Sequence, residues 1–471
     1  MQKNKIKSDK QIKSNAMRDN NGDLLVLQDG RARWNERKSY SVNFANIFYM
    51  LGSEELKKAQ ENDSLRIDKK TGEIFVDSEV AKKYFLKSDR MSDCSSRLAY
   101  KIDVEGLKKL HNAYFCRDRL CPICMWRLSR RLAWETNLIM AKYTADNPDM
   151  IPILISLTVK NPQMGELSQM LDVLCNGDSG AWALFRKWLA RRGIKDYVRT
   201  IEITLNDKAQ SWHPHLHVLA FAPKDYFKKG NKNYISHEIL KKEWQHVCKL
   251  DYEPYVDIRR CYDKSAGANE RIKFDGDMRM VSFAGAVKET AKYCVKPLKL
   301  FNNFDCDGAE IETKEKLNIK DVVRELAESL SGRRLRALGG KLKQIAKELK
   351  FDDDESKKDL LHKDETGTAE SVWQEIYEYV FGDKQYYLTG REAVEQSPER
   401  DTVPQFREVA ETANDTAVAA VGSGQLIRTA TDKLEKIFAD GANIYSMKFE
   451  QAGENIQAVG VEGLALARAI F

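Results

Sequence analysis

The sequence predicts an α+β protein in which a mostly antiparallel sheet carries helices on one face. Three observations lead to this class. Segments with β-branched, apolar strand character alternate with segments of helical periodicity, in the order strand, helix, strand, strand, helix, strand, helix. Two of the strands follow each other directly, as antiparallel neighbours do. With 471 residues and 42% hydrophobic content, the chain is long enough and apolar enough to bury cores.

Four segments are predicted as strands. The first opens with Pro152 and is closed by Asn161 and Pro162, and its residues are β-branched and apolar. The second alternates between an apolar face that includes Ile201 and a polar face that includes Glu202. The four strands cover residues 151–160, 198–204, 212–221 and 254–260.

Five segments are predicted as helices from their periodicity. The first ends at Asn147 and Pro148, the second is interrupted between Gly177 and Gly180, and the fourth is closed by Pro297. A fifth, strongly basic helix follows the strand-rich region. The five helices cover residues 124–146, 167–192, 237–250, 282–296 and 333–350.

The chain divides by composition into five regions. An N-terminal segment is expected to be partly disordered, since its first 30 residues are polar, with short amphipathic pieces at 41–56 and 78–87. A Cys-rich segment, a catalytic domain, a helical basic region and a mainly helical C-terminal tail follow. The tail is rich in Ala and Gly, and residues 373–388 have helix-then-strand character. These regions span residues 1–90, 91–146, 147–300, 301–400 and 401–471.

Charge and hydropathy limit the class of protein. No apolar run approaches the roughly 20 residues that span a bilayer, and the N-terminus lacks a signal-peptide core, so a cytoplasmic protein is expected. The formal net charge of +6 is small for this length, so nucleic-acid binding must depend on local patches. Such patches lie at 127–131, 186–192 and 333–350, and each could equally be a solvated helix face.

Three of the seven histidines, His213, His215 and His217, alternate along one predicted strand. Alternate side chains share a face, so His215 and His217 can close on one metal ion. Pro214 makes His213 the least certain member, although it is an alternative ligand. Glu202 on the preceding strand points away from the apolar side and is a candidate third ligand. The alternative is that these residues are only polar side chains on a sheet surface.

Nine cysteines without an export signal indicate metal binding or buried thiols rather than disulfides. Cys121 and Cys124 come from one CPxC turn, Cys116 precedes them by a short loop, and Cys94 lies upstream. Together they offer a four-thiolate zinc site, with Cys94 assigned from its position alone. The basic residues that follow can contact DNA phosphates. These are Arg127, Arg130 and Arg131.

The last helix of the catalytic region carries Glu289 and Tyr293 one turn apart, flanked by Lys292 and Lys296. A tyrosine with its ordinary pKa of about 10 is a poor nucleophile, so it needs nearby positive charge or a metal-polarised phosphate. Taken alone, this helix is as typical of an amphipathic packing helix as of an active site.

In combination, these motifs resemble the Rep initiators of rolling-circle plasmids, within the HUH endonuclease superfamily. The resemblance rests on His215-Leu216-His217, on residues 289–293, on the strand end 157–161 and on the turn 116–124, which occur in the family's order. It extends from about residue 34 to 350 and includes, more weakly, the segment 332–341.

The resemblance implies a sheet of the ferredoxin or RRM kind and a DNA nickase. Tyr293 would be the nucleophile that becomes joined to the 5′ phosphate, and Glu289 would activate water to end replication. His215, His217 and Glu202 would hold Mg²⁺ or Mn²⁺, and the cysteines would hold a structural Zn²⁺. Lys292 and Lys296 would contact origin DNA, and a host helicase and polymerase would be partners; no membrane contact is implied.

Two other classes of protein are compatible with the same residues. In one, His213, His215 and His217 bind zinc that activates water on a small substrate. In the other, a zinc-containing protein binds DNA without cutting it, and the sheet merely packs the histidines. Nicking of single-stranded DNA with covalent attachment would separate the proposed class from both. The origin sequence and the oligomeric state cannot be inferred from these motifs.

Overall fold

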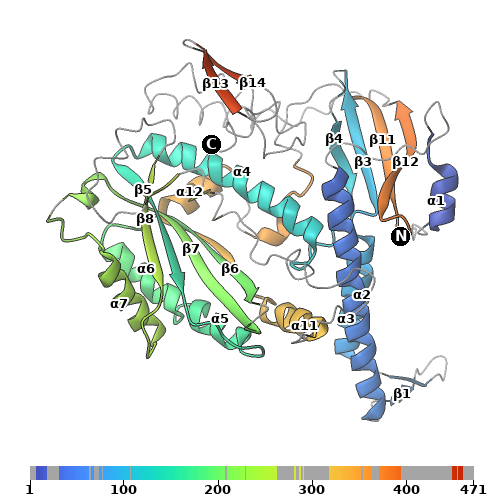
Figure 1. Ribbon diagram of the computed structural model, residues 1–471, viewed down its shortest axis with the longest axis horizontal. Helices are drawn as coiled ribbons and strands as arrows, with labels where there is room; N and C mark the ends of the chain where they lie inside the picture. The colour runs from blue at the N-terminus through green and yellow to red at the C-terminus, as the bar shows by residue number, and fades with distance from the viewer. Residues whose placement is uncertain are drawn as a thin grey trace.

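The computed structural model describes residues 7–18, 31–62, 65–67, 74–76, 78–104, 106, 108–206, 209–228, 230–262, 280–282, 286–287, 290, 318–351, 354–362, 371–393, 448–452 and 455–459. Two sheets organise this part of the chain. One has six strands in the order β10-β6-β7-β5-β8-β9, and the other has four in the order β12-β11-β3-β4. The long helix α4 (Pro122–Asp146) runs from the six-stranded sheet to the helices beside the second sheet (Figure 1).

The six-stranded sheet contains all four predicted strands, and its pairs are antiparallel except for β8 with β9. Its central strands β6 and β7 bury side chains on both faces along most of their length, because helices cover each face of the sheet. The strands are β10 (Arg336–Gly339), β6 (Tyr197–Asn206), β7 (Ser211–Pro223), β5 (Met150–Thr158), β8 (Val256–Tyr262) and β9 (Met280–Ser282).

Helices cover both faces of this sheet. Ile153 and Ile155 point into one core with α5 (Leu167–Cys175), α6 (Ala181–Arg191), α7 (His237–Cys248) and α11 (Ile319–Ser329). Leu154 and Leu219 point into a second core with α4 and α12 (Gly340–Glu348). The predicted α+β class with a mostly antiparallel sheet is therefore confirmed, but the helices are distributed on two faces. The reason is that the strands bury apolar residues on alternate sides rather than on one side.

The second sheet joins segments that are far apart in sequence. Its strands are β3 (Arg97–Asp103), β4 (Lys108–Ala113), β11 (Ser371–Val380) and β12 (Gln385–Ala393). The helices α2 (Arg31–Glu61) and α3 (Glu79–Asp93) pack along each other beside it, and α1 (Asp9–Asn15) packs against β12 (Figure 1). Residues 371–393 thus share a sheet with residues 97–113, although the sequence assigned the two segments to separate regions.

Several local expectations change with the structure. The segment 373–388, expected as helix then strand, lies in two paired strands, and 336–339 is the edge strand β10 rather than the start of a helix. The amphipathic piece 41–56 is part of the 31-residue helix α2. Within the described part of the tail, β13 (Lys448–Ala452) pairs with β14 (Asn455–Val459) where a helix was expected. The remaining short elements are β1 (Leu65–Ile67), β2 (Ile74–Val76) and the 3₁₀ turns η1 (Lys224–Phe227) and η2 (Glu355–Lys357).

None of the helices that the structure describes combines the length and the apolar character needed to cross a bilayer.

Candidate functional site

A carboxylate and two imidazoles converge on the face of the six-stranded sheet that α4 and α12 cover. Glu202 on β6 lies directly opposite His215 on β7, and His217 is two positions further along the same strand. His215 and His217 are two positions apart on one strand. Because successive side chains point to opposite faces, these two lie on the same face. The antiparallel register adds Glu202 to that face, and this register could not be known from the sequence.

The ligand atoms of these three residues are close enough to share one cation. The Oε2 atom of Glu202 lies 3.3 Å from Nε2 of His215 and 3.2 Å from Nε2 of His217. Neighbouring ligands of an octahedral cation with bonds of about 2.1 Å are separated by about 3.0 Å, so the spacing fits a single ion. Glu202 is only 2% exposed, and a carboxylate this buried requires a cationic or hydrogen-bonding environment.

Second-layer contacts orient both imidazoles. Nδ1 of His217 lies 3.4 Å from the Ser156 hydroxyl on β5, and Nδ1 of His215 lies 3.3 Å from the carbonyl oxygen of His213. A contact at Nδ1 fixes the orientation of a ring whose Nε2 binds a metal. Both Nε2 atoms consequently face Glu202. Ser156 was not singled out from the sequence, since only the pairing of β5 with β7 brings it next to His217.

His213, the alternative metal ligand, is engaged elsewhere. Its Nδ1 lies 2.7 Å from Oδ1 of Asn161, and it does not belong to the group formed by Glu202, His215 and His217. Burial lowers the pKa of His213, and the neighbouring His215 lowers it further. His213 therefore flanks the site without joining the group formed by Glu202, His215 and His217. Asn161 belongs to the strand-end motif 157–161. This motif and the histidine motif therefore lie next to each other in the fold.

Ala286, Val287 and Thr290 contact the same face. Ala286 and Val287 are buried in the core with α4 and α12, and the carbonyl oxygen of Thr290 accepts a 2.7 Å hydrogen bond from the hydroxyl of Thr200. Thr200 lies directly opposite His217. The chain is therefore fixed beside the Glu202, His215 and His217 group three residues before Tyr293. Tyr293, Glu289, Lys292 and Lys296 themselves lie outside the described residues.

The four predicted cysteines form a second cluster. It lies where the C-terminal end of α3 meets the N-terminus of α4 and the loop that precedes α4. Cys94 lies 3.5 Å from Cys124 and 3.6 Å from Cys121, and Cys116 lies 3.6 Å from Cys124, measured between Sγ atoms. Tetrahedral zinc with Zn–S bonds of about 2.3 Å separates its sulfurs by about 3.8 Å, so the donor set fits. Backbone amides support it, since the N–H of Arg117 donates to Cys124 at 3.2 Å.

A buried lysine lies beside the cysteine cluster. Lys38 of α2 is fully buried and donates to the carbonyl oxygens of Ser92, at 2.5 Å, and Cys94, at 2.8 Å. Burial lowers the pKa of Lys38 to about 8, while the charges of Cys94, Cys121 and Cys116 act in the opposite direction. A cation here would offset negative charge on the cysteines if they bound a metal ion as thiolates. This role of Lys38 could not be inferred from sequence spacing, because Lys38 lies 56 positions before Cys94.

The structure contradicts the expectation that Arg127 and Arg131 contact DNA. Both side chains are buried, at 7% and 5% exposure. Nε of Arg127 donates to the carbonyl oxygen of Leu360, and Nε of Arg131 donates to Glu135. Both guanidinium groups are therefore used in hydrogen bonds within the protein. Glu135 also accepts a 2.5 Å hydrogen bond from Lys358. Arg130 is half-buried on the same helix and stays a candidate DNA contact.

Comparisons with known proteins identify relatives of this chain. A family described as "Replication protein" matches residues 107–387, more than half of the chain. "Protein rep" of Bacillus amyloliquefaciens is 35% identical over 273 residues, which cover 58% of this chain and 76% of that protein. "Protein rep" of Lactiplantibacillus plantarum is 31% identical over 312 residues, covering 64% and 89%. "Protein rep" of Streptococcus pneumoniae is 30% identical over 263 residues, covering 56% and 72%.

No solved structure matches the chain. The family match spans Glu202, His215, His217 and three of the four clustered cysteines. The alignments with these relatives cover most of each relative's length. The chain therefore belongs to the family of plasmid replication proteins, as its resemblance to rolling-circle Rep initiators indicated.

Proposed function

We propose that this protein initiates rolling-circle replication by nicking one strand of a plasmid origin and remaining attached to the new 5′ end through Tyr293. One observation carries the proposal: the hydrogen bond between Thr200 and Thr290 connects the sheet beside His217 to the chain three residues before Tyr293. Three residues span at most about 11 Å, a length short enough for a tyrosine at position 293 to reach the Glu202, His215 and His217 group, which supports the proposal.

In this proposal, Glu202, His215 and His217 hold Mg²⁺ or Mn²⁺. When bound, the cation withdraws charge from the scissile phosphate and stabilises the charge that develops on its oxygens. The protein contributes by orienting the ligands: Ser156 and the carbonyl oxygen of His213 hold the two rings so that both Nε2 atoms point to Glu202. Imidazole ligands also accept other divalent ions, so the test below compares two metals.

The proposed nicking reaction exchanges one phosphate ester for another and needs no external energy source. The phenolic oxygen of Tyr293 loses its proton and attacks phosphorus, and a bond forms between that oxygen and phosphorus. The bond to the 3′ oxygen breaks, and this oxygen takes up a proton to become the 3′ hydroxyl that primes synthesis. The new phosphotyrosine ester retains the energy of the broken linkage, so the reverse reaction rejoins the strand.

Termination is assigned to Glu289. Its carboxylate would take a proton from water as the water attacks the phosphotyrosine, releasing the tyrosine and a 5′ phosphate. Separate nucleophiles for initiation and release prevent endless re-initiation. The DNA would be opened by a host helicase and copied by a host polymerase.

The proposal is tested by incubating the full chain with supercoiled plasmid that carries its replicon, in Mn²⁺ or Mg²⁺. The expected result is a relaxed circle with a denaturant-resistant adduct, whose modified peptide contains Tyr293 by mass spectrometry. Removing His215 and His217 should abolish the nick, whereas removing the exposed His246 on α7 should leave it unchanged. DNA binding without any nick would favour a non-catalytic origin-binding protein, and metal-dependent hydrolysis without an adduct would favour a hydrolase.

A further inference from the structure

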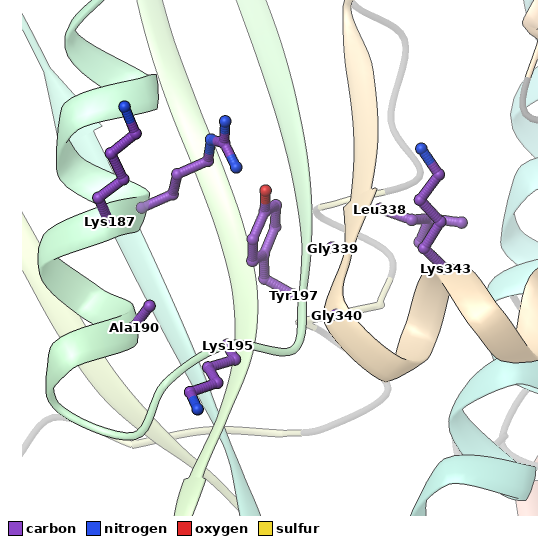
Figure 2. A pocket seen from close by; sticks show the side chains of 9 residues that line it. Lys187, Ala190, Lys195, Tyr197, Leu338, Gly339, Gly340 and Lys343 are labelled. Carbon is purple, nitrogen blue, oxygen red and sulfur yellow. The ribbon is translucent and has the colours of Figure 1, made fainter. Parts of the chain in front are cut away.

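A basic cavity of about 400 Å³ lies at the β10 edge of the six-stranded sheet, away from the Glu202, His215 and His217 group. It opens between α6 and the start of α12, with the ring of Tyr197 between the α6 side, which carries Lys187, and the α12 side, which carries Lys343 (Figure 2). Its lining residues are Arg186, Lys187, Ala190, Lys195, Tyr197, Leu338, Gly339, Gly340 and Lys343. Four of the nine are cationic and none is acidic.

The floor of this cavity is built rigidly. The Tyr197 ring packs on Gly339, where an added Cβ would lie 2.2 Å from the ring, and meets Trp182 edge-on at 5.0 Å. Gly340 has a φ of +58°, and a Cβ there would lie 2.0 Å from Oδ1 of Asp196. Both glycines are therefore required for the approach of β10 to β6. The weakly recognised motif 332–341 thus forms one wall of the cavity.

The acidic groups nearby are occupied elsewhere. Asp196 accepts bonds from the N–H of Lys341 and the hydroxyl of Tyr143, both at 2.7 Å. Arg186 pairs with the exposed Asp178 at 3.2 Å, a contact that solvent screens. Among the residues that the structure describes, Lys187 and Lys195 have no acidic partner, and both are exposed. The cavity is therefore positive and available to an anion.

We infer that this cavity binds the phosphodiester backbone of DNA next to the nick site, which rests on the proposed function. A rigid cavity with several cations and a tyrosine hydroxyl suits phosphate oxygens, which accept bonds from lysine, arginine and tyrosine. The cavity does not take the scissile phosphate. Tyr197 and Glu202 are five positions apart on one strand, so they lie on opposite faces, about 17 Å apart along β6. At about 3.4 Å per nucleotide, this corresponds to about five nucleotides of DNA.

The test compares two double variants with the same loss of charge. Lys187→Ala with Lys195→Ala removes the exposed cations of the cavity, and Lys57→Ala with Lys83→Ala removes two exposed lysines on α2 and α3. Binding to a 30-base-pair duplex from the replicon is measured by fluorescence anisotropy between 50 and 300 mM salt. The cavity variant should bind about 10-fold more weakly, with a salt slope smaller by about 1.8, because two phosphate contacts are lost. The control pair should retain the parent slope.

Three readouts keep the inference separate from the proposed function. Single-turnover nicking at saturating DNA should be unchanged in the control variant, because Lys57 and Lys83 lie outside both the cavity and the candidate metal site. A parent protein that binds duplex with the expected slope but never nicks would remove the proposed function and leave the cavity assignment intact. Equal slopes for the cavity and control variants would overturn the cavity assignment and leave nicking intact.

Lysine acetylation identifies the ligand. Duplex DNA should protect Lys187 and Lys195 from acetylation, while Lys57 and Lys83 stay reactive. A deoxynucleoside monophosphate at the same phosphate concentration should give no protection. Protection by the mononucleotide alone would show a small-nucleotide site and overturn the assignment to the DNA backbone.

Discussion

The hydroxyl of Thr200 donates a 2.7 Å hydrogen bond to the carbonyl oxygen of Thr290, and Thr200 lies directly opposite His217 in the sheet. This contact connects the two motifs that carry the chemistry. In the sequence, Glu289 of the tyrosine motif lies 72 positions after His217. The fold nevertheless brings the chain before Tyr293 to the face of the sheet that carries His217.

Removing one candidate metal ligand should slow nicking severely. His215→Ala deletes an imidazole whose Nε2 lies 3.3 Å from Glu202, and a cation held by fewer ligands stabilises the transition state less. A loss of about 4 kcal/mol corresponds to a nicking rate about 10³-fold lower. Calorimetry with Mn²⁺ should show the matching loss of affinity. The exposed His246→Ala variant is the control, and metal affinity equal in both variants would contradict the assignment.

Ser156 should act on metal affinity through His217. Ser156→Ala removes the hydroxyl 3.4 Å from Nδ1 of His217, so the ring is held less firmly. We expect Mn²⁺ affinity to fall by about 10-fold, the usual effect of losing a contact behind a metal ligand. Ser156→Thr, which keeps a hydroxyl, should restore most of the affinity. An alanine variant that binds Mn²⁺ like the parent would show that the serine only packs.

Tyrosine and glutamate should separate initiation from release. Tyr293→Phe is expected to bind origin DNA normally but to form no adduct, because the attacking oxygen is gone. Glu289→Ala is expected to nick normally and to prolong the adduct lifetime by about 10²-fold, because general-base assistance is lost. Both are measured by denaturing gels over time. An adduct in the phenylalanine variant, or unchanged lifetimes in the alanine variant, would refute the corresponding role.

The cysteine cluster should hold zinc and stabilise the start of α4. Cys121→Ser removes a thiolate at the N-cap of that helix, so we expect the loss of one zinc ion per chain by atomic absorption. The melting temperature should fall by at least about 5 °C, because metal binding is coupled to folding. Cys175→Ser, outside the cluster, should keep its zinc. Zinc retained by the Cys121 variant would exclude the cluster as its site.

Neighbouring arginines on α4 should behave differently. Arg131→Ala leaves buried Glu135 with one cationic partner fewer, so we expect a loss of about 3 kcal/mol in the free energy of unfolding by urea titration. Arg130→Ala should change stability by less than about 0.5 kcal/mol. Only the Arg130 variant should reduce the salt dependence of DNA binding without destabilising the fold. A stable Arg131 variant with weakened DNA binding would restore the role that its burial excludes.

The sequence was most informative where chemistry is local. The alternation in His215-Leu216-His217 required only the pleat of one strand, and Cys121 and Cys124 come from a single turn, so both candidate metal sites could be predicted in part. Helix and strand boundaries such as those of α4, β5 and β6 also followed local periodicity and proline positions. Patches of charge were less reliable, because burial of Arg127 and Arg131 depends on residues 358–360, far along the chain.

The amino-acid sequence by itself determined the fold class, the residue types of both candidate metal sites and the family of replication proteins to which the chain belongs. Only the tertiary structure decided that Glu202 lies opposite His215, that Ser156 and Lys38 support the two sites, that helices cover both faces of the sheet, and that a basic cavity forms at the β10 edge. The physical reason is that side-chain direction is set locally by strand and helix geometry, whereas register, burial and charge pairing depend on segments that folding brings together from distant positions.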